Sequence, residues 1–87
     1  MALELEALTE QIIGAAIEVH RRLGPGFIES IYEAAMMIEL RKRGLQARQQ
    51  VEVPIYYDDL EIGLHKLDLV VEETIIVELK VVKDFDD

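Results

Sequence analysis

The sequence contains 87 residues and no cysteine, and 51% of its residues are apolar. This length fits one small domain, and the apolar content excludes a disordered acidic tail. Disulfide bonds are excluded, and a structural zinc site would have only two histidines to draw on. Acidic residues outnumber basic ones by 18 to 9, and the net charge of −9 disfavours non-specific nucleic-acid binding because phosphates are repelled.

The charge is unevenly distributed along the chain. Residues 51–87 carry eleven acidic and three basic side chains, whereas residues 1–50 carry seven acidic and six basic ones. The acidity therefore belongs to the C-terminal half. Most of the basic side chains of the first half fall near predicted helix ends, where cations interact favourably with the helix dipole. These six are Arg21, Arg22, Arg41, Lys42, Arg43 and Arg48.

No targeting or membrane segment is recognisable. Residues 1–7 alternate apolar and acidic side chains, without the cationic start and apolar core of a secretory signal. No apolar run approaches the about 20 residues that span a bilayer. A cytoplasmic protein that does not bind membranes is the resulting expectation.

Residues 9–23 predict the first helix, because apolar side chains recur at steps of three and four. Thr9 is a candidate N-cap, and the leucines before it leave open an earlier start at Ala2. Gly24 and Pro25 end the helix. His20 lies on the apolar stripe and is expected to be a packed, hydrogen-bonded core residue. The stripe consists of Ile12, Ile13, Ala16, Ile17, His20 and Leu23.

Residues 28–43 predict a second helix that ends before Gly44. Because the loop between the two helices is short, they should pack against each other or against a common sheet. The predicted buried face of the second helix contains Ile28, Ile31, Tyr32, Ala35, Met36 and Ile38.

The rest of the chain has the alternation of β-strands, at residues 51–57, 60–71 and 75–82. Pro54 places the first strand at a sheet edge or points this position outward. In the second strand the apolar residues fall on even positions up to Leu64 and on odd positions from Leu67 onward. This switch predicts a bulge near residues 63–65. The predicted fold class is α+β, with two helices followed by a three-stranded antiparallel meander.

The last predicted hairpin brings charged residues together. If residues 72–74 form the turn, paired residue numbers sum to 146, so Asp68 lies opposite Glu78 and Lys66 opposite Lys80. Opposed carboxylates on one face have Cβ atoms about 4.5–5.5 Å apart, and they need a metal ion or lysines to compensate their repulsion. The simpler interpretation is the solvated polar face of an amphipathic hairpin.

A family resemblance adds to this picture. Residues 26–32, GFIESIY, form a G-x-x-E-x-x-Y string, preceded by LTEQIIGAAIEVHRRLGPG and followed by KLDLVVEETIIVELK. With these segments the chain resembles the GxxExxY family of the PD-(D/E)XK nuclease superfamily over residues 8–82. That superfamily usually has an α-β-β-β-α-β core. The resemblance therefore implies that residues 1–87 form a single restriction-endonuclease-like domain that lacks the C-terminal helix and strand.

The resemblance also implies a site. Asp68 corresponds to the acid of the second core strand, and Glu78 and Lys80 to the (D/E)-x-K pair of the third, so these three are the expected catalytic residues. Glu29 corresponds to a helix glutamate, and Glu29, Asp68 and Glu78 would bind Mg²⁺ or Mn²⁺. Tyr32 either orients Glu29 or packs, and His65 either contacts substrate or is exposed at a turn.

Two functions remain open at this point. The first is a metal-dependent nuclease that hydrolyses phosphodiester bonds, with nucleic acid as a partner that the net charge disfavours. The alternative is a catalytically inactive interaction module of the same fold, a homo-oligomer that self-associates through its open sheet edge.

Overall fold

The structure is a computed structural model that describes residues 2–81 of the chain. Helices α1 (Ala2–Leu23) and α2 (Glu29–Lys42) precede strands β1 (Ala47–Tyr57), β2 (Leu60–Val71) and β3 (Ile75–Val77). The strands form one antiparallel sheet in the order β1-β2-β3. The α+β class and the meander are confirmed, as is the early helix start at Ala2. Neither helix is both long and apolar enough to cross a membrane, within the described residues.

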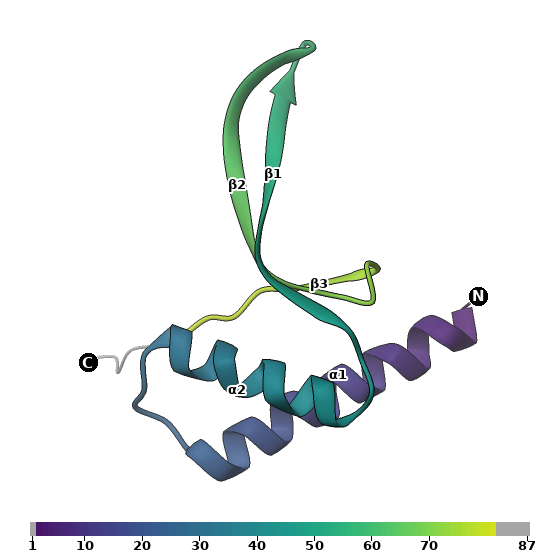
Figure 1. The fold of residues 1–87 in the computed structure, drawn as a ribbon, viewed down its shortest axis with the longest axis vertical. Coiled ribbons are helices and arrows are strands. Elements are labelled where there is room, and N and C mark those ends of the chain that lie inside the picture. Colours follow the sequence, from purple (N-terminus) through teal and green to yellow (C-terminus); the bar gives the residue numbers. More distant parts are fainter. Residues whose placement is uncertain (1, 82–87) are drawn as a thin grey trace, which may run out of the picture.

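The helices form one layer, and only the base of the sheet lies on it (Figure 1). The other ends of β1 and β2 continue as a two-stranded ribbon that projects away from the helices. The core therefore lies between the helices and the last part of β2. Its buried members are Ile12, Ala15, Val19, Met36, Leu40, Leu69 and Val71.

The buried stripe of α1 differs from the prediction. Ile12, Ala15 and Val19 face the core, whereas Ile13 and Ile17 are 52% and 62% exposed. His20 is also exposed, so its prediction as a core residue is wrong. The physical reason is that α1 carries two adjacent apolar stripes, and α2 and the sheet cover only one of them.

The predicted buried face of α2 is also partly wrong. Met36 is buried, and Tyr32 and Ala35 are half-buried, but Ile28, Ile31 and Ile38 are exposed. The helix is rotated so that two glutamates join the buried face instead. These are Glu33 and Glu39, whose carboxylates find hydrogen-bonding partners inside the fold.

The ribbon formed by β1 and β2 has the predicted bulge at a slightly different place. Pro54 lies on β1, which is an edge strand as expected. Ile55 pairs with Gly63 and Tyr56 pairs with Glu61, so Ile62 is the extra residue, one position before the predicted range. The switch from even to odd apolar positions predicts that the register shifts, but it does not identify the residue that is left unpaired.

The β2–β3 pairing has the predicted register. Leu69 pairs with Val77 and Val71 with Ile75, and both sums equal 146. The strand itself is shorter than predicted, because β3 ends at Val77 and residues 78–81 are not in a strand. The last predicted strand residue, Val82, lies outside the described residues. The ladder therefore stops one pair before Asp68 and Glu78.

Candidate functional site

The G-x-x-E-x-x-Y string shapes the loop that enters α2. Gly26 has a φ of +108°, a conformation that favours glycine. The Tyr32 hydroxyl donates a 2.7 Å hydrogen bond to the Gly24 carbonyl oxygen and accepts a 3.2 Å bond from the Phe27 amide. The Phe27 and Tyr32 rings also meet edge to face, with centroids 6.1 Å apart. Tyr32 thus fixes the loop, and its hydroxyl is bonded to this loop and not to Glu29.

Glu29 begins α2, and its side chain is exposed. Its position in the first turn is electrostatically favourable, because the amide groups at a helix N-terminus carry partial positive charge. Within residues 2–81, its carboxylate makes no hydrogen bond or ion pair to another side chain. The motif therefore presents Glu29 to solvent at the helix start.

A second glutamate of α2, Glu33, is buried with only 6% of its surface exposed. The Gln50 side-chain amide donates to both of its carboxylate oxygens, at 3.1 and 3.0 Å. Gln50 has a φ of +51° in the middle of β1, where an extended backbone is the rule. Such local strain clusters at functional sites.

The β1–β2 register relates Gln50 to the predicted catalytic aspartate. Gln49 pairs with Leu69 and Val51 pairs with Leu67, so Gln50 lies across from Asp68. Glu33 and Gln50 are the candidate functional residues that sequence reasoning missed. The sequence did contain one indication for Glu33. It lies three and seven residues before Met36 and Leu40, so the three side chains share one helix face.

Asp68 explains why the β2–β3 ladder ends. Its Oδ2 atom accepts a 2.7 Å hydrogen bond from the Leu79 backbone amide. If the strand pairing continued, the Leu79 amide would donate to a backbone carbonyl of β2. It donates to the Asp68 side chain instead. Asp68 is half-buried, and its second oxygen has no hydrogen-bonding partner in the described part of the chain.

Glu78 and Lys80 follow directly after β3. Both side chains are exposed, whereas Val77 and Leu79, which alternate with them, pack against the core cluster. This alternation of burial leaves both Glu78 and Lys80 on the exposed side of the segment. Across residues 2–81, no three acidic or histidine side chains gather closely enough to hold a metal ion. Glu29, Asp68 and Glu78 are thus not assembled as a triad.

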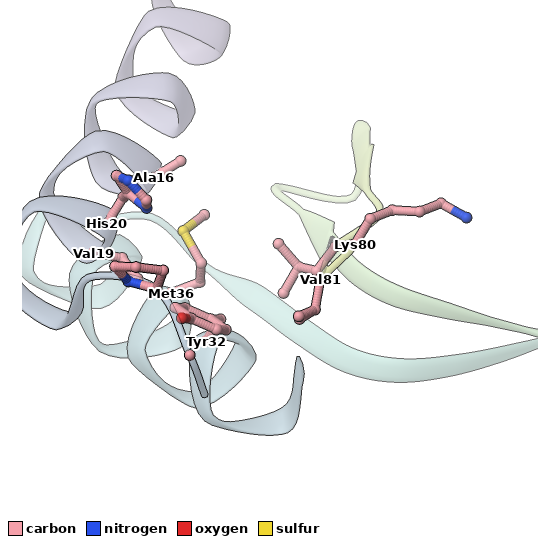
Figure 2. Close-up of a pocket in the computed structure, with 10 residues that line it drawn as sticks. Ala16, Val19, His20, Tyr32, Met36, Lys80 and Val81 are labelled. Carbon is pink, nitrogen blue, oxygen red and sulfur yellow. The ribbon is translucent and has the colours of Figure 1, made fainter. Parts of the chain in front are cut away.

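Lys80 lies at the border of a mostly apolar pocket of about 450 Å³. The pocket is formed by α1, the loop before α2, α2 itself and the segment after β3 (Figure 2). The Lys80 ammonium group extends away from the helices in this view. His20 and Tyr32 line the pocket, while Asp68 and Glu78 do not. His65 is exposed on β2 opposite Val53.

Comparison with known proteins identifies the family. No curated protein and no solved structure matches the chain. The sequence profile of the PD-(D/E)XK nuclease superfamily matches residues 6–87, which is nearly the whole chain. The fold of the chain, with two helices before an antiparallel meander, is consistent with the core of that superfamily. The GxxExxY subgroup is not tested by this match and stays a prediction. The chain belongs to the PD-(D/E)XK nuclease superfamily.

Proposed function

We propose that this domain is a divalent-metal-dependent nuclease that hydrolyses nucleic-acid phosphodiester bonds. The observation that carries the proposal is the hydrogen bond from the Leu79 amide to Asp68. This bond fixes the Asp68 carboxylate beside the segment that carries Glu78 and Lys80. The three residue types that the superfamily name specifies are thereby held at one end of the β2–β3 ladder.

The side chains at this end have the chemistry that Mg²⁺ or Mn²⁺ requires. Carboxylate oxygens are hard ligands, and Asp68 has one oxygen engaged by the Leu79 amide and a second that is free for a cation. Glu78, directly after β3, would be the second carboxylate. A divalent cation bound there would lower the pKa of a coordinated water and polarise the phosphate.

A third carboxylate would come from α2, and two glutamates compete for this role. Glu29 corresponds to the motif glutamate but is exposed in the first helical turn. Glu33 is buried, has only the neutral Gln50 amide as a hydrogen-bonding partner within residues 2–81, and lies near the β1 position opposite Asp68. A buried carboxylate without a cationic partner is costly, and a metal ion would compensate this cost. We therefore prefer Glu33 to Glu29.

The other site residues have roles that follow from their positions. The Lys80 ammonium group would hold the attacking water or stabilise negative charge developing on phosphate. His65, exposed three residues before Asp68, would contact the substrate backbone. Tyr32 would act indirectly by holding the loop before α2.

The test is cleavage of single- and double-stranded DNA and RNA by purified protein in the presence of Mg²⁺ or Mn²⁺. Glu78→Gln and Lys80→Met should abolish cleavage. Glu52→Gln, which changes another exposed acid of the same sheet, should leave cleavage intact. Activity that survives Glu78→Gln would come from a contaminant, and absence of cleavage with every substrate and metal would reject the nuclease proposal.

Glu29→Gln and Glu33→Gln form a matched pair that identifies the helix ligand. Both changes remove one charge and keep the side-chain shape. Mn²⁺ affinity, measured by calorimetry, should fall more for Glu33→Gln than for Glu29→Gln. The opposite order would return the role to Glu29, as the motif predicts.

A catalytically inactive interaction module remains the second candidate. It is favoured by the absence of a three-carboxylate cluster among residues 2–81, and by the unpaired outer edge of the three-residue strand β3. This candidate predicts no saturable Mn²⁺ binding. It also predicts that Ile76→Pro in the edge strand disrupts self-association.

A further inference from the structure

The outer part of the β1–β2 ribbon, residues 54–66, contributes no buried side chain to the fold. It projects away from the helices (Figure 1), and we call this segment the distal ribbon. Its large apolar side chains are between 41% and 70% exposed. They are Ile55, Tyr56, Tyr57, Leu60, Ile62 and Leu64.

Such a ribbon is unusual for a protein that stays monomeric. A two-stranded hairpin that packs on nothing is marginally stable in water. Each of the six large apolar side chains of the distal ribbon is at least 41% exposed. A contiguous exposed apolar surface of this kind marks an interaction site. Covering the ribbon would therefore remove apolar surface from water.

The charge of the distal ribbon restricts what can cover it. Asp58, Asp59 and Glu61 lie at or next to its tip, and Lys66 at its far end is the only cation. The tip would repel phosphates, which disfavours nucleic acid and anionic lipid as the occupant. Its complement is a surface that combines apolar side chains with unneutralised cations.

The helix layer of this chain carries such a surface, which we call the helix junction. A hollow of about 290 Å³ lies between α1 and α2, and exposed Ile38 and Arg22 are among its lining residues. Four cations and two acids are placed at this junction by their contacts. They are Arg21, Arg22, Lys42 and Arg43, with Glu18 and Glu39.

The two acids cannot neutralise four cations, so the helix junction keeps a net charge of +2. Arg22 and Lys42 share the Glu39 carboxylate, at 3.3 and 3.2 Å. The Arg21 guanidinium pairs with Glu18, and this hydrogen bond lowers the pKa of the Glu18 carboxyl. The fourth cation, Arg43, has no acidic partner in the described part of the chain.

Arg43 is bonded at 2.8 Å to the neutral side-chain amide of Gln11. Its guanidinium lies so close to Gly14 that a Cβ atom there would be only 2.9 Å from Nη1. The charge of Arg43 therefore remains available to an acidic partner.

We propose that the distal ribbon docks on the helix junction of a second copy of this chain, reciprocally, in a two-fold dimer. The ribbon extends away from its own helices, so the complementary surface is within reach only on another molecule (Figure 1). The acidic tip then meets the cationic junction. Tyr57, 70% exposed beside the tip, enters the hollow lined by Ile38. Tyrosine is enriched among residues that carry interface energy.

A reciprocal charge exchange tests this pairing. One variant carries Asp58→Asn, Asp59→Gly and Glu61→Lys, which makes the ribbon tip cationic and keeps a favourable Asn-Gly turn. The other carries Lys42→Glu and Arg43→Glu, which makes the helix junction acidic. Each variant alone repels itself, whereas the mixture restores both contacts. Circular dichroism checks that each variant is folded.

Sedimentation equilibrium is the measurement. The unchanged protein should be a dimer at micromolar concentration, and each variant alone should dimerise at least about tenfold more weakly. The equimolar mixture should recover a heterodimer, and Tyr57→Ser should weaken it again. A monomeric unchanged protein, variants that dimerise normally, or a mixture that fails to associate would each overturn the proposal.

Discussion

The two ends of β2 differ in what surrounds them. At the base, Leu69 and Val71 are completely buried against the helices, whereas Leu60, Ile62 and Leu64 at the other end are exposed. The same alternating pattern runs through both ends. Apolar alternation thus defines a strand face without specifying what covers it. In this chain, the base positions the candidate nuclease site and the distal ribbon provides a surface for association.

The largest expected effect is a difference in unfolding free energy between leucine-to-alanine substitutions at the two ends of β2. Leu69→Ala removes a fully buried side chain and should cost about 2–5 kcal/mol of unfolding free energy. Leu64→Ala makes the same chemical change in the distal ribbon, where the leucine is 63% exposed, and should cost less than about 0.5 kcal/mol in a monomer.

Urea denaturation followed by circular dichroism measures both changes. Because the ribbon is proposed to be an interface, Leu64→Ala should be compared at concentrations below and above the dimer midpoint. Equal costs for the two substitutions would mean that the ribbon is packed in the monomer, which would remove the contrast between the two ends.

The next largest effect concerns catalysis at the base. Asp68→Asn keeps an oxygen that can accept from the Leu79 amide but loses the charge that a metal needs. Metal-dependent cleavage should fall by about 100-fold or more. Unfolding free energy should change by only about 1 kcal/mol, because a neutral hydrogen-bond acceptor replaces a charged one.

A cleavage assay with a parallel denaturation curve tests this separation, and Glu52→Gln serves as the control on the same sheet. If Asp68→Asn changed stability slightly and left cleavage and Mn²⁺ binding unaltered, the charged residues would be only the solvated face of a hairpin.

A smaller effect is expected in the loop before α2. Tyr32→Phe keeps the ring that meets Phe27 but removes the hydroxyl that bonds the Gly24 carbonyl and the Phe27 amide. The cost should be about 1–2 kcal/mol, since two modest hydrogen bonds are lost. Thermal unfolding measures this cost. An unchanged melting temperature would show that the ring alone holds the loop.

Much of the fold follows from the sequence because local patterns determine it. The two helices end shortly before Gly24 and Gly44, as the turn residues predict. The meander and the register in which paired residue numbers sum to 146 follow from turn residues and alternation. The buried faces of the helices were less predictable, because Ile13 and Ile17 are as apolar as the residues that became buried. Which stripe is covered depends on tertiary packing, and periodicity alone does not contain that information.

The candidate site shows the same limit. The order of Asp68, Glu78 and Lys80 is a sequence feature, and the register argument predicts that the first two lie opposite each other. By contrast, the bond from the Leu79 amide to Asp68 and the contact of Gln50 with Glu33 join different elements. Gln50 in particular adopts a positive φ that its residue type does not favour, so its role is visible only in three dimensions.

The smallest expected effect concerns the tip of the distal ribbon. Asp58 and Asp59 both have positive φ, at 52° and 65°, in the two-residue turn between Tyr57 and Leu60. Asp59→Gly should relieve about 0.5–1 kcal/mol of backbone strain, because glycine adopts this conformation without steric cost. Since the ribbon does not share the helix-packed core, this gain should slow hydrogen exchange in residues 54–66 of the monomer, below the dimer midpoint, and leave global unfolding nearly unchanged. Hydrogen exchange followed by mass spectrometry distinguishes the two ends: protection that rises equally at the base and at the tip would show that the ribbon and the core unfold as one unit.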